Sequence, residues 1–325
     1  MSRARLILNP SSGTDKAPDF LPGINQALRE RFGMMEIVMT TGARDGEQAA
    51  VQAARDGCDR VFVAGGDGTL NEVVNGLLAA DALDRVAIGL LPLGTGNDFA
   101  RMLHLSEKPD EALASLLNAR EVRADVGTLN GRAFVNTSGG GFISEVTEAL
   151  DDRLKSIAGK LAFLIAGGQA VLEYEPAPVR VDVAAGDFKP LSYDAEDGPA
   201  EGDGWRDEGG RKVLDTTLHM FAVCNARQIG GGRLIAPHAR IDDGWLDVCL
   251  VDAMPTLEFI GLLRKVADGS HLEDARVRYF RARRMEMTFE RPVKVNTDGE
   301  LLEASRCSYG VLPGAARFLA GTSNA

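Results

Sequence analysis

Three glycine-rich segments each follow an apolar run in the N-terminal third of this 325-residue chain. They are NPSSG at 9–13, GGDGTLNE at 65–72 and PLGTGNDFAR at 92–101. Glycine lets a backbone come close to a phosphate, and a helix N-terminus adds N–H donors and a favourable dipole. Asp67 is a candidate ligand for Mg2+, which prefers oxygen atoms. One such segment alone is equally well explained as a tight strand-to-helix turn, but three together favour a phosphate site.

Two carboxylates lie one glycine apart near the end of the chain, at Asp298 and Glu300. A positioned carboxylate can accept a proton from a hydroxyl group during its reaction. The residues TDG at 297–299 are also common in tight turns, which is the simpler explanation of the pattern taken alone. The segment DDG at 242–244 has the same two explanations.

The elements that must position these residues alternate in the first third of the chain. Apolar runs predict strands at 5–8, 36–39, 60–64 and 86–91. The segments between them that mix polar and apolar residues predict helices at 16–31, 45–56 and 70–80. Apolar strands separated by helices predict a parallel sheet covered on both faces. Ligands of such sheets bind beyond the carboxyl ends of the strands, so we expect the three glycine segments at one rim.

After about residue 120 the pattern changes to short strands, predicted to be antiparallel, at 133–137, 179–183, 218–223, 246–251 and 285–289. Helices are predicted near 145–173 and 255–267. The segment 186–211 is rich in Gly, Asp and Glu without periodicity, which predicts a mobile surface insertion. The fold class expected is therefore an N-terminal doubly wound α/β domain followed by a β-rich domain with helical insertions.

Composition narrows the functional classes. The net charge of -11 disfavours nucleic-acid binding. The four cysteines form no CxxC pair, which predicts buried free thiols rather than zinc ligands or disulfides. No apolar run reaches about 18 residues and no signal-peptide stretch follows Met1, so we expect a cytoplasmic protein. The stretch 276–294 has seven basic and two acidic residues, which indicates either a solvated strand face or a contact with an anionic membrane.

Several nucleotide-binding motifs are excluded. The chain has no GxxxxGK[ST], and no HRD or DFG set. Phe99 stands where the dinucleotide fingerprint requires Gly or Ala after GTG.

The segments GGDGTLNEVVNG at 65–76 and PLGTGNDFAR at 92–101 closely resemble the diacylglycerol-kinase catalytic family, especially its bacterial lipid-kinase branch. Further matching segments follow in order: DVG at 125–127, GGF at 140–142, GKLAF at 159–163, GGG at 230–232, APHARIDDGWLDV at 236–248 and NTDGE at 296–300. NAD kinases and phosphofructokinase-like enzymes carry loops similar to GGDGT. The segments GTGNDFAR and DGE favour a lipid kinase over these two classes of enzyme.

The resemblance implies a phosphofructokinase-like ATP-binding domain of residues 1–127 with a returning tail at 308–325, and a β-sandwich substrate domain of residues 128–307. It implies Mg-dependent transfer of the ATP γ-phosphate to a lipid hydroxyl, in lipid metabolism and phospholipid biosynthesis. The acceptor is diacylglycerol, a sphingoid base or phosphatidylglycerol, and the active site lies between the domains.

The resemblance also assigns residues. Those that would hold ATP are Asn9, Pro10, Ser11, Ser12, Gly13, Thr41, Gly65, Gly66, Asp67, Gly68, Thr69, Leu70, Asn71 and Thr95. Asp298 or Glu300 would accept the proton of the lipid hydroxyl. Arg240, Asp243 and Trp245 match a structural Mg2+ site in which only Asp243 is a side-chain ligand. A polar network around the transferred phosphate would contain Asp98, Arg101, Asp125 and Lys160.

Two departures from the family pattern affect these assignments. Thr14 and Asp15 separate the first loop from Lys16, and the acidic insertion is longer than usual. An NAD-kinase-like enzyme with a soluble acceptor and a catalytically silent nucleotide-binding regulator stay open as alternatives. Lipid substrate and a peripheral membrane contact are the expected partners, and a homodimer is left open.

Overall fold

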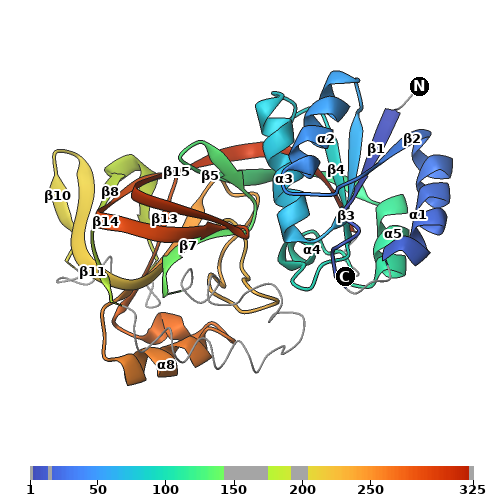
Figure 1. Cartoon of the computed structure of the whole chain (residues 1–325). Helices are drawn as coiled ribbons and strands as arrows, with labels where there is room; N and C mark the ends of the chain where they lie inside the picture. The colour runs from blue at the N-terminus through green and yellow to red at the C-terminus, as the bar shows by residue number, and fades with distance from the viewer. Residues whose placement is uncertain (1–2, 14–16, 143–174, 192–203, 322–325) are drawn as a thin grey trace.

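The computed structural model describes residues 3–13, 17–142, 175–191 and 204–321. They form two regions connected by one continuous sheet of 15 strands (Figure 1). The N-terminal region contains β1 (Arg3–Leu8), α1 (Ala17–Phe32), β2 (Met34–Met39), α2 (Asp45–Arg55), β3 (Arg60–Gly65), α3 (Asp67–Ala79), β4 (Ala87–Pro92), α4 (Asp98–Met102), α5 (Pro109–Leu117) and β5 (Arg120–Leu129).

The N-terminal sheet has the order β2-β1-β3-β4 with all pairs parallel, which confirms the predicted parallel sheet. Helices α2 and α3 pack together on one side of it, and α1 and α5 on the other (Figure 1). Strands of this kind are apolar throughout because both faces are covered. In β3, the residues from Val61 to Ala64 are all buried.

Close packing of α2 on α3 depends on small residues. Ala50 and Ala53 are fully buried in α2. A Cβ built on Gly76 of α3 would lie 2.3 Å from the carbonyl oxygen of Glu47, so only glycine allows the two helices to approach this closely. This contact fixes the position of the N-terminal turn of α2 relative to α3.

The C-terminal region is antiparallel, as predicted. Its elements are β6 (Arg132–Phe134), β7 (Thr137–Gly141), β8 (Ala177–Ala184), η1 (Ala185–Asp187), β9 (Phe188–Pro190), β10 (Arg206–Glu208), β11 (Arg211–Cys224), β12 (Leu246–Asp252), α8 (Thr256–Lys265), η2 (Ser270–Glu273), β13 (Val277–Ala282), β14 (Arg284–Thr297) and β15 (Glu300–Ala320). The strand order is β14-β7-β11-β12-β13-β9. Two separate apolar clusters form its core.

Strand β15 joins the two regions. Its first part pairs with β14, and its last part pairs with β5 and, through Arg317 and Phe318, in parallel with β4. The turn between β14 and β15, at Asp298 and Gly299, contacts the N-terminal region directly, because Asn71 of α3 donates a hydrogen bond to Asp298. A strand continuous through both regions limits how far the two can move independently.

One predicted helix and the predicted insertion differ from the observed elements. Helix α3 begins at Asp67, three residues earlier than predicted, so the glycine segment forms its first turn. The predicted helices near 145–173 fall outside the described residues. The mobile insertion predicted at 186–211 is wrong at both ends, where β9 and β10 form; residues 192–203 lie outside the described part.

Aromatic packing explains these two short strands. Phe188 and Trp205 both pack on Phe280 of β13, with ring centroids 5.2 and 5.1 Å away. Strands of three residues are too short to show an alternating pattern, so the sequence carried no signal for them. All four cysteines are free and buried, as predicted. Among the described helices, none combines the length and the apolar character needed to cross a bilayer.

Candidate active site

The three glycine-rich segments meet at one rim of the parallel sheet, as predicted. Asn9, which follows β1, donates from Nδ2 to Thr69 Oγ1 at 3.1 Å. Gly66 and Gly94 bring the second and third segments together, since a Cβ built on Gly94 would lie only 2.6 Å from the Gly66 Cα. These two glycines are therefore required for loop packing, whatever ligand the rim binds.

Helix α3 opens directly onto this rim. Its first residue is Asp67. The N-cap residue, Gly66, has no side chain with which to cap the helix. A Cβ built on Gly68, in the first turn, would meet no heavy atom within 4 Å. An uncapped helix N-terminus with open space in front of its first turn is an arrangement that binds phosphate groups.

Small polar side chains surround the same rim. The Ser11 N–H donates to Asn9 Oδ1 at 3.0 Å, which shapes the first loop. Thr41, after β2, donates from its backbone N and its Oγ1 to Asp45 Oδ2 at 2.7 and 2.9 Å. Thr95 is exposed in the third segment. The residues expected to hold a nucleotide thus lie on one edge, although they are spread over 87 positions of the chain (9 to 95).

Asp67 connects the second glycine segment to the third. Its carboxylate accepts the backbone N–H groups of Asp98 and Phe99, both at 3.1 Å, and so caps α4. Asn136 donates to the same carboxylate from Nδ2 at 3.2 Å. Three donors leave Asp67 little free acceptor capacity. A cation near Asp67 would be reached by a remaining lone pair or through water.

Asp98 connects the two regions. It is 5% exposed and accepts the N–H groups of Gly231 and Gly232 at 3.1 and 2.9 Å. Arg101 pairs with it at 2.6 Å. Burial raises the pKa of Asp98, and the charge of Asp67 raises it further, against the hydrogen bonds from the two glycines. The φ angles of Gly231 and Gly232, 82° and 107°, favour glycine at both positions.

Asp298 occupies the two-residue turn between β14 and β15 with φ of 48°. Its carboxylate accepts hydrogen bonds from Val135 N at 2.6 Å, Thr137 N at 2.9 Å, Asn71 Nδ2 at 3.0 Å and Asn136 N at 3.1 Å. A carboxylate has about four lone-pair sites, so these donors fill it. Burial raises the pKa of Asp298 to about 6, while the four hydrogen bonds act in the opposite direction.

Glu300 faces a different partner. Arg132 donates to it from Nε at 3.0 Å and from Nη2 at 2.8 Å. The Glu300 side chain is 38% exposed, and the bidentate contact leaves about half of its lone pairs available. The two carboxylates of the DGE segment therefore do not act as one group. Asp298 is an internal anchor, and Glu300 keeps acceptor capacity.

Asn71 holds the anchor against α3. Its Nδ2 donates to Asp298 and to the carbonyl oxygen of Ala133, both at 3.0 Å. Its Oδ1 accepts a hydrogen bond from Asn75 Nδ2 at 2.9 Å. The residue is 1% exposed. Both Nδ2 hydrogens are used within the protein and the side chain is buried, so we expect Asn71 to contribute to nucleotide binding through its backbone or through the position of its neighbours.

The side chain of Asp243, the expected metal ligand, already has partners. Its Oδ1 accepts the Trp245 N–H at 3.1 Å, and its Oδ2 lies 3.2 Å from Arg281 Nη1. Arg240 pairs with Asp242 at 3.1 Å. A single carboxylate shared with an arginine is a weak Mg2+ site unless backbone carbonyls and water complete it.

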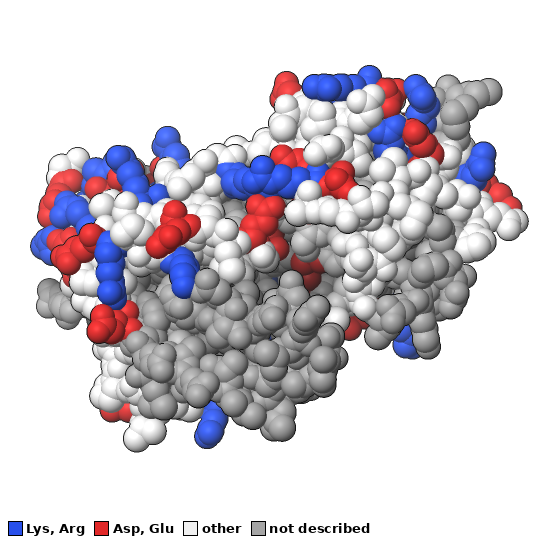
Figure 2. All heavy atoms as spheres, viewed as in Figure 1, with Lys and Arg blue, Asp and Glu red and all other residues white. Residues whose placement is uncertain are grey.

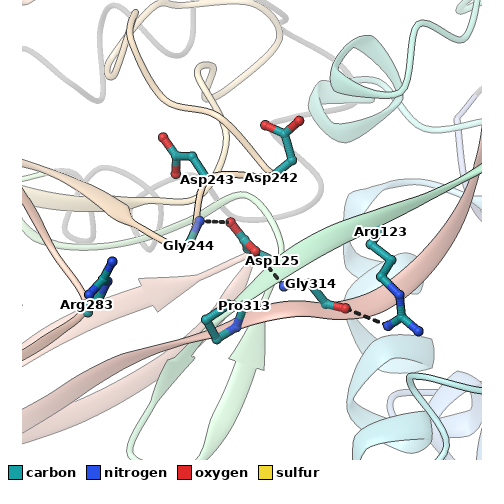
Figure 3. A pocket seen from close by; sticks show the side chains of 8 residues that line it. All are labelled: Arg123, Asp125, Asp242, Asp243, Gly244, Arg283, Pro313 and Gly314. Atoms are coloured by element: carbon teal, nitrogen blue, oxygen red, sulfur yellow. Dashed lines mark hydrogen bonds between the residues drawn. The ribbon is translucent and has the colours of Figure 1, made fainter.

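Asp125 lies next to this set, in a pocket of about 450 Å3 (Figure 3). It accepts the N–H groups of Gly244 and Gly314, both at 2.6 Å. Burial raises the pKa of Asp125, and the charges of Asp243 and Asp242 raise it further. Figure 3 shows Asp242 and Asp243 pointing their carboxylates away from Asp125. Within the described residues, no three His, Cys, Asp or Glu side chains converge as metal ligands would.

Ion pairs neutralise most of the basic stretch 276–294. Arg276 pairs with Asp274 and Glu258, Arg278 with Asp252, Arg281 with Asp243 and Asp247, Arg284 with Asp187, and Arg291 with Glu175. Figure 2 shows basic and acidic side chains interleaved on the face it displays, without a large area of one sign. The local excess of positive charge counted along the sequence is therefore largely cancelled in the fold.

Two residues at the site had no role in the sequence interpretation. Asn136 donates to Asp298 from its backbone and to Asp67 from its side chain, so it links the anchor to the glycine rim. Arg132 holds Glu300. Asn136 lies within the segment 133–137, which the sequence identified only as a strand, and Arg132 directly precedes it. Their polar side chains next to apolar residues were the sole signal. Lys160, expected in the phosphate network, lies outside the described residues.

Comparison with known proteins gives two family matches. Residues 3–129 match the model of the diacylglycerol kinase catalytic domain, and residues 139–320 match that of the YegS C-terminal NAD kinase beta sandwich-like domain.

The chain is 30% identical to the diacylglycerol kinase of Bacillus subtilis (strain 168) over 315 residues, covering 97% of this chain and 92% of the relative. It is 32% identical over 313 residues to a protein of Chromohalobacter salexigens named "Probable lipid kinase YegS-like", covering 95% and 90%. A crystal structure of a candidate diacylglycerol kinase from Bacillus anthracis str. Sterne aligns with a TM-score of 0.78 at 25% identity, covering 100% of this chain and 97% of the other.

Proposed function

The chain belongs to the family of the diacylglycerol kinase catalytic domain, and we propose on that basis that it is an ATP-dependent lipid kinase that phosphorylates a lipid hydroxyl. One observation carries the proposal. The turn with Asp298 and Glu300 is held against the glycine rim through Asn71 and Asn136, which brings two carboxylates close to the helix terminus that we propose as the phosphate site.

ATP would lie along the rim, with its phosphates in front of the first turn of α3. Backbone N–H groups and the helix dipole would stabilise the phosphate charge there. A Cβ added at Gly68 meets no heavy atom within 4 Å, so the phosphates could approach the helix closely there. We propose that Thr41, Thr95 and the first loop contact the rest of the nucleotide.

Glu300 would accept the proton of the lipid hydroxyl. The hydroxyl oxygen attacks the γ-phosphorus, the bond from that phosphorus to the β,γ-bridging oxygen breaks, ADP leaves, and the proton goes to the Glu300 carboxylate. We assign this step to Glu300 rather than Asp298 because four donors fill the lone pairs of Asp298. Asp298 would hold the turn in position for the reaction.

Mg2+, which would enter with ATP, would neutralise charge on the β- and γ-phosphates. Asp67 is the carboxylate placed to meet it at the rim, directly or through water. Arg240, Asp243 and Trp245 would offer a structural cation only one carboxylate, that of Asp243, which already has partners within the protein. No step of the reaction is assigned to that position.

The two regions would bind different substrates. We propose that residues 1–127 with the tail 308–325 bind ATP, and that residues 128–307 bind the lipid. The tail contributes because the end of β15 pairs with β4 and β5.

A radiolabelled-ATP assay tests the proposal. Micelles of diacylglycerol, a sphingoid base or phosphatidylglycerol should yield a phosphorylated lipid, identified by product mass, whereas NAD should not be phosphorylated. Product from NAD alone would favour the NAD-kinase-like alternative. ATP binding without any product would favour a silent regulator.

The rate should depend on pH through Asp298. Above about pH 6 the Asp298 carboxylate can accept hydrogen bonds from all four donors. Protonation below about pH 6 occupies one lone pair and displaces one of these donors. We therefore expect kcat to be level above neutral pH and to fall as the pH is lowered through about 6. A pH profile of kcat checks this, and Asp298→Asn should lack that acidic limb.

We also propose a peripheral contact with the membrane, which a substitution of Arg284 tests. Its side chain pairs with Asp187 but is 79% exposed, whereas that of Arg281 is 13% exposed and held by both Asp243 and Asp247. Arg284→Glu should weaken sedimentation with phosphatidylglycerol vesicles by at least about fivefold, since the lost basic residue alone contributes about 1 kcal/mol at an anionic surface.

Lys108→Glu is the matched control, because Lys108 is 77% exposed and lies on the N-terminal region. Added salt should reproduce the effect of Arg284→Glu. Binding that is equal for neutral and anionic vesicles would show that the basic stretch is only a solvated face.

A further inference from the structure

Arg132 is held rigidly in place beside Glu300. It follows a two-residue turn between β5 and β6, Asn130 and Gly131, whose φ angles are 49° and 84°. Such Asn-Gly turns set the register of a hairpin. The Asn130 amide also bonds to the backbone of Arg306 and Ser308 in β15, at 3.1 and 2.9 Å. The strand that carries Arg132 is thus fixed to the strand that begins with Glu300.

The guanidinium uses three nitrogens on two carboxylates. Nε and Nη2 contact the two oxygens of Glu300, and Nη1 lies 2.9 Å from Glu47 Oε2 in an ion pair. Glu47 is in the first turn of α2, which packs against α3, the helix that begins at the glycine rim. Arg132 therefore joins a carboxylate of the β14–β15 turn to a helix of the nucleotide-binding region.

A bidentate arginine fixes the plane of a carboxylate, which an ammonium group cannot do. It also leaves outward lone pairs of Glu300 free to receive a proton. The side chain of Arg132 is 26% exposed, so the contact is partly shielded from water and not a freely solvated surface pair.

We propose that Arg132 is a positioning residue of the phosphoryl transfer, which fixes the orientation of the Glu300 carboxylate toward the lipid hydroxyl and links it, through Glu47, to the nucleotide-binding region. The proposal rests on the proposed lipid kinase activity. Arg132 itself touches neither ATP nor the acceptor. Its loss should affect the chemical step and leave nucleotide binding largely unchanged.

The test is Arg132→Ala with guanidinium added back. Misplacing a reacting group by about 1 Å can cost about 10²-fold, so kcat should fall by about that factor while the KM for ATP changes by less than about threefold. Guanidinium chloride at low millimolar concentration should restore kcat at least about tenfold, because it occupies the space left by the side chain. Sodium chloride at equal ionic strength should not.

Arg60→Ala is the matched control. Arg60 is also 26% exposed and paired with carboxylates, but it starts β3, at the end of the sheet opposite the glycine rim. Its kcat should stay at the wild-type value and should not respond to guanidinium. Wild-type protein without lipid phosphorylation would refute the proposed function. Active wild-type protein with an unaffected Arg132→Ala variant would refute only the positioning role.

Arg132→Lys covers the case in which the alanine variant does not fold. Lysine keeps the charge but cannot form the bidentate contact. We expect a folded protein with an unchanged melting temperature and a reduced kcat. A kcat equal to wild type in Arg132→Lys would overturn the proposal, and so would a loss in Arg132→Ala that guanidinium does not reverse.

Discussion

Glu300→Gln should lower kcat for lipid phosphorylation by about 10²–10⁴-fold, which is the usual contribution of a positioned general base. Glutamine keeps the size and can still accept a hydrogen bond from Arg132, but it cannot take a proton from the lipid hydroxyl at neutral pH. The KM for ATP should change little, because the glycine rim lies on other elements.

Asp298→Asn should also reduce kcat strongly, by a different route. An asparagine offers one oxygen in place of two, so it cannot accept all four hydrogen bonds that hold the turn. The two losses should not add in the double variant, since an anchor and the group it holds act as a unit.

Glu286→Gln is the matched control for these variants. Glu286 is on β14 of the same sheet and pairs with an arginine, Arg306, at 2.7 Å, away from the β14–β15 turn. Its kcat should equal that of the wild type in steady-state assays on lipid micelles. If Glu300→Gln and Asp298→Asn both work at near wild-type rates, the DGE segment is only a turn and the proton acceptor lies elsewhere.

Gly68→Val should abolish ATP binding without unfolding the protein. An added Cβ at position 68 meets no heavy atom within 4 Å, and the residue is exposed, so we expect the fold to accept the valine. The same side chain would occupy the space that the proposed ATP phosphates need in front of α3. Isothermal calorimetry should show no heat of ATP binding, and the melting temperature should lose its increase with added ATP.

Gly261→Val is the control that separates the ligand from the helix. Gly261 lies within α8, and a Cβ added there would also meet no heavy atom within 4 Å, so valine carries a similar cost in helix propensity. This variant should bind ATP as the wild type does. Unchanged ATP affinity in a folded Gly68→Val protein would remove the α3 terminus from the nucleotide site.

The structure separates glycines that look equivalent in the sequence. Gly66 is required because its backbone lies against that of Gly94, and a substitution there would disturb loop packing before it affected a ligand. Gly68 has no such constraint. Only the second position can report on nucleotide binding alone, which is why the experiment uses it.

The proposed nucleotide and acceptor sites share one set of hydrogen bonds. Asn136 contacts both Asp67 at the rim and Asp298 in the turn, and Asp98 accepts two backbone N–H groups from the C-terminal region. A substitution at either site should therefore also alter the geometry of the other through these contacts.

The sequence by itself determined the parallel sheet, the gathering of the glycine segments and the family. Apolar runs separated by helices leave few alternatives to a covered parallel sheet, and the carboxyl ends of its strands must meet at one edge. The match of GGDGTLNEVVNG and PLGTGNDFAR was sufficient for the family because these segments are long and in order.

Only the tertiary structure decided which carboxylate is free and which charges are cancelled. Asp298 and Glu300 are close in sequence, but their partners are more than 160 residues away. Arg132, the partner of Glu300, begins β6, whereas Val135 to Thr137, the backbone partners of Asp298, connect β6 to β7. Most acids that pair with the basic stretch likewise lie on other elements, such as Asp252 and Asp247 on β12, Glu258 on α8 and Asp187 on η1. Local periodicity carries no information about such long-range partners, because they depend on which strands the fold places side by side.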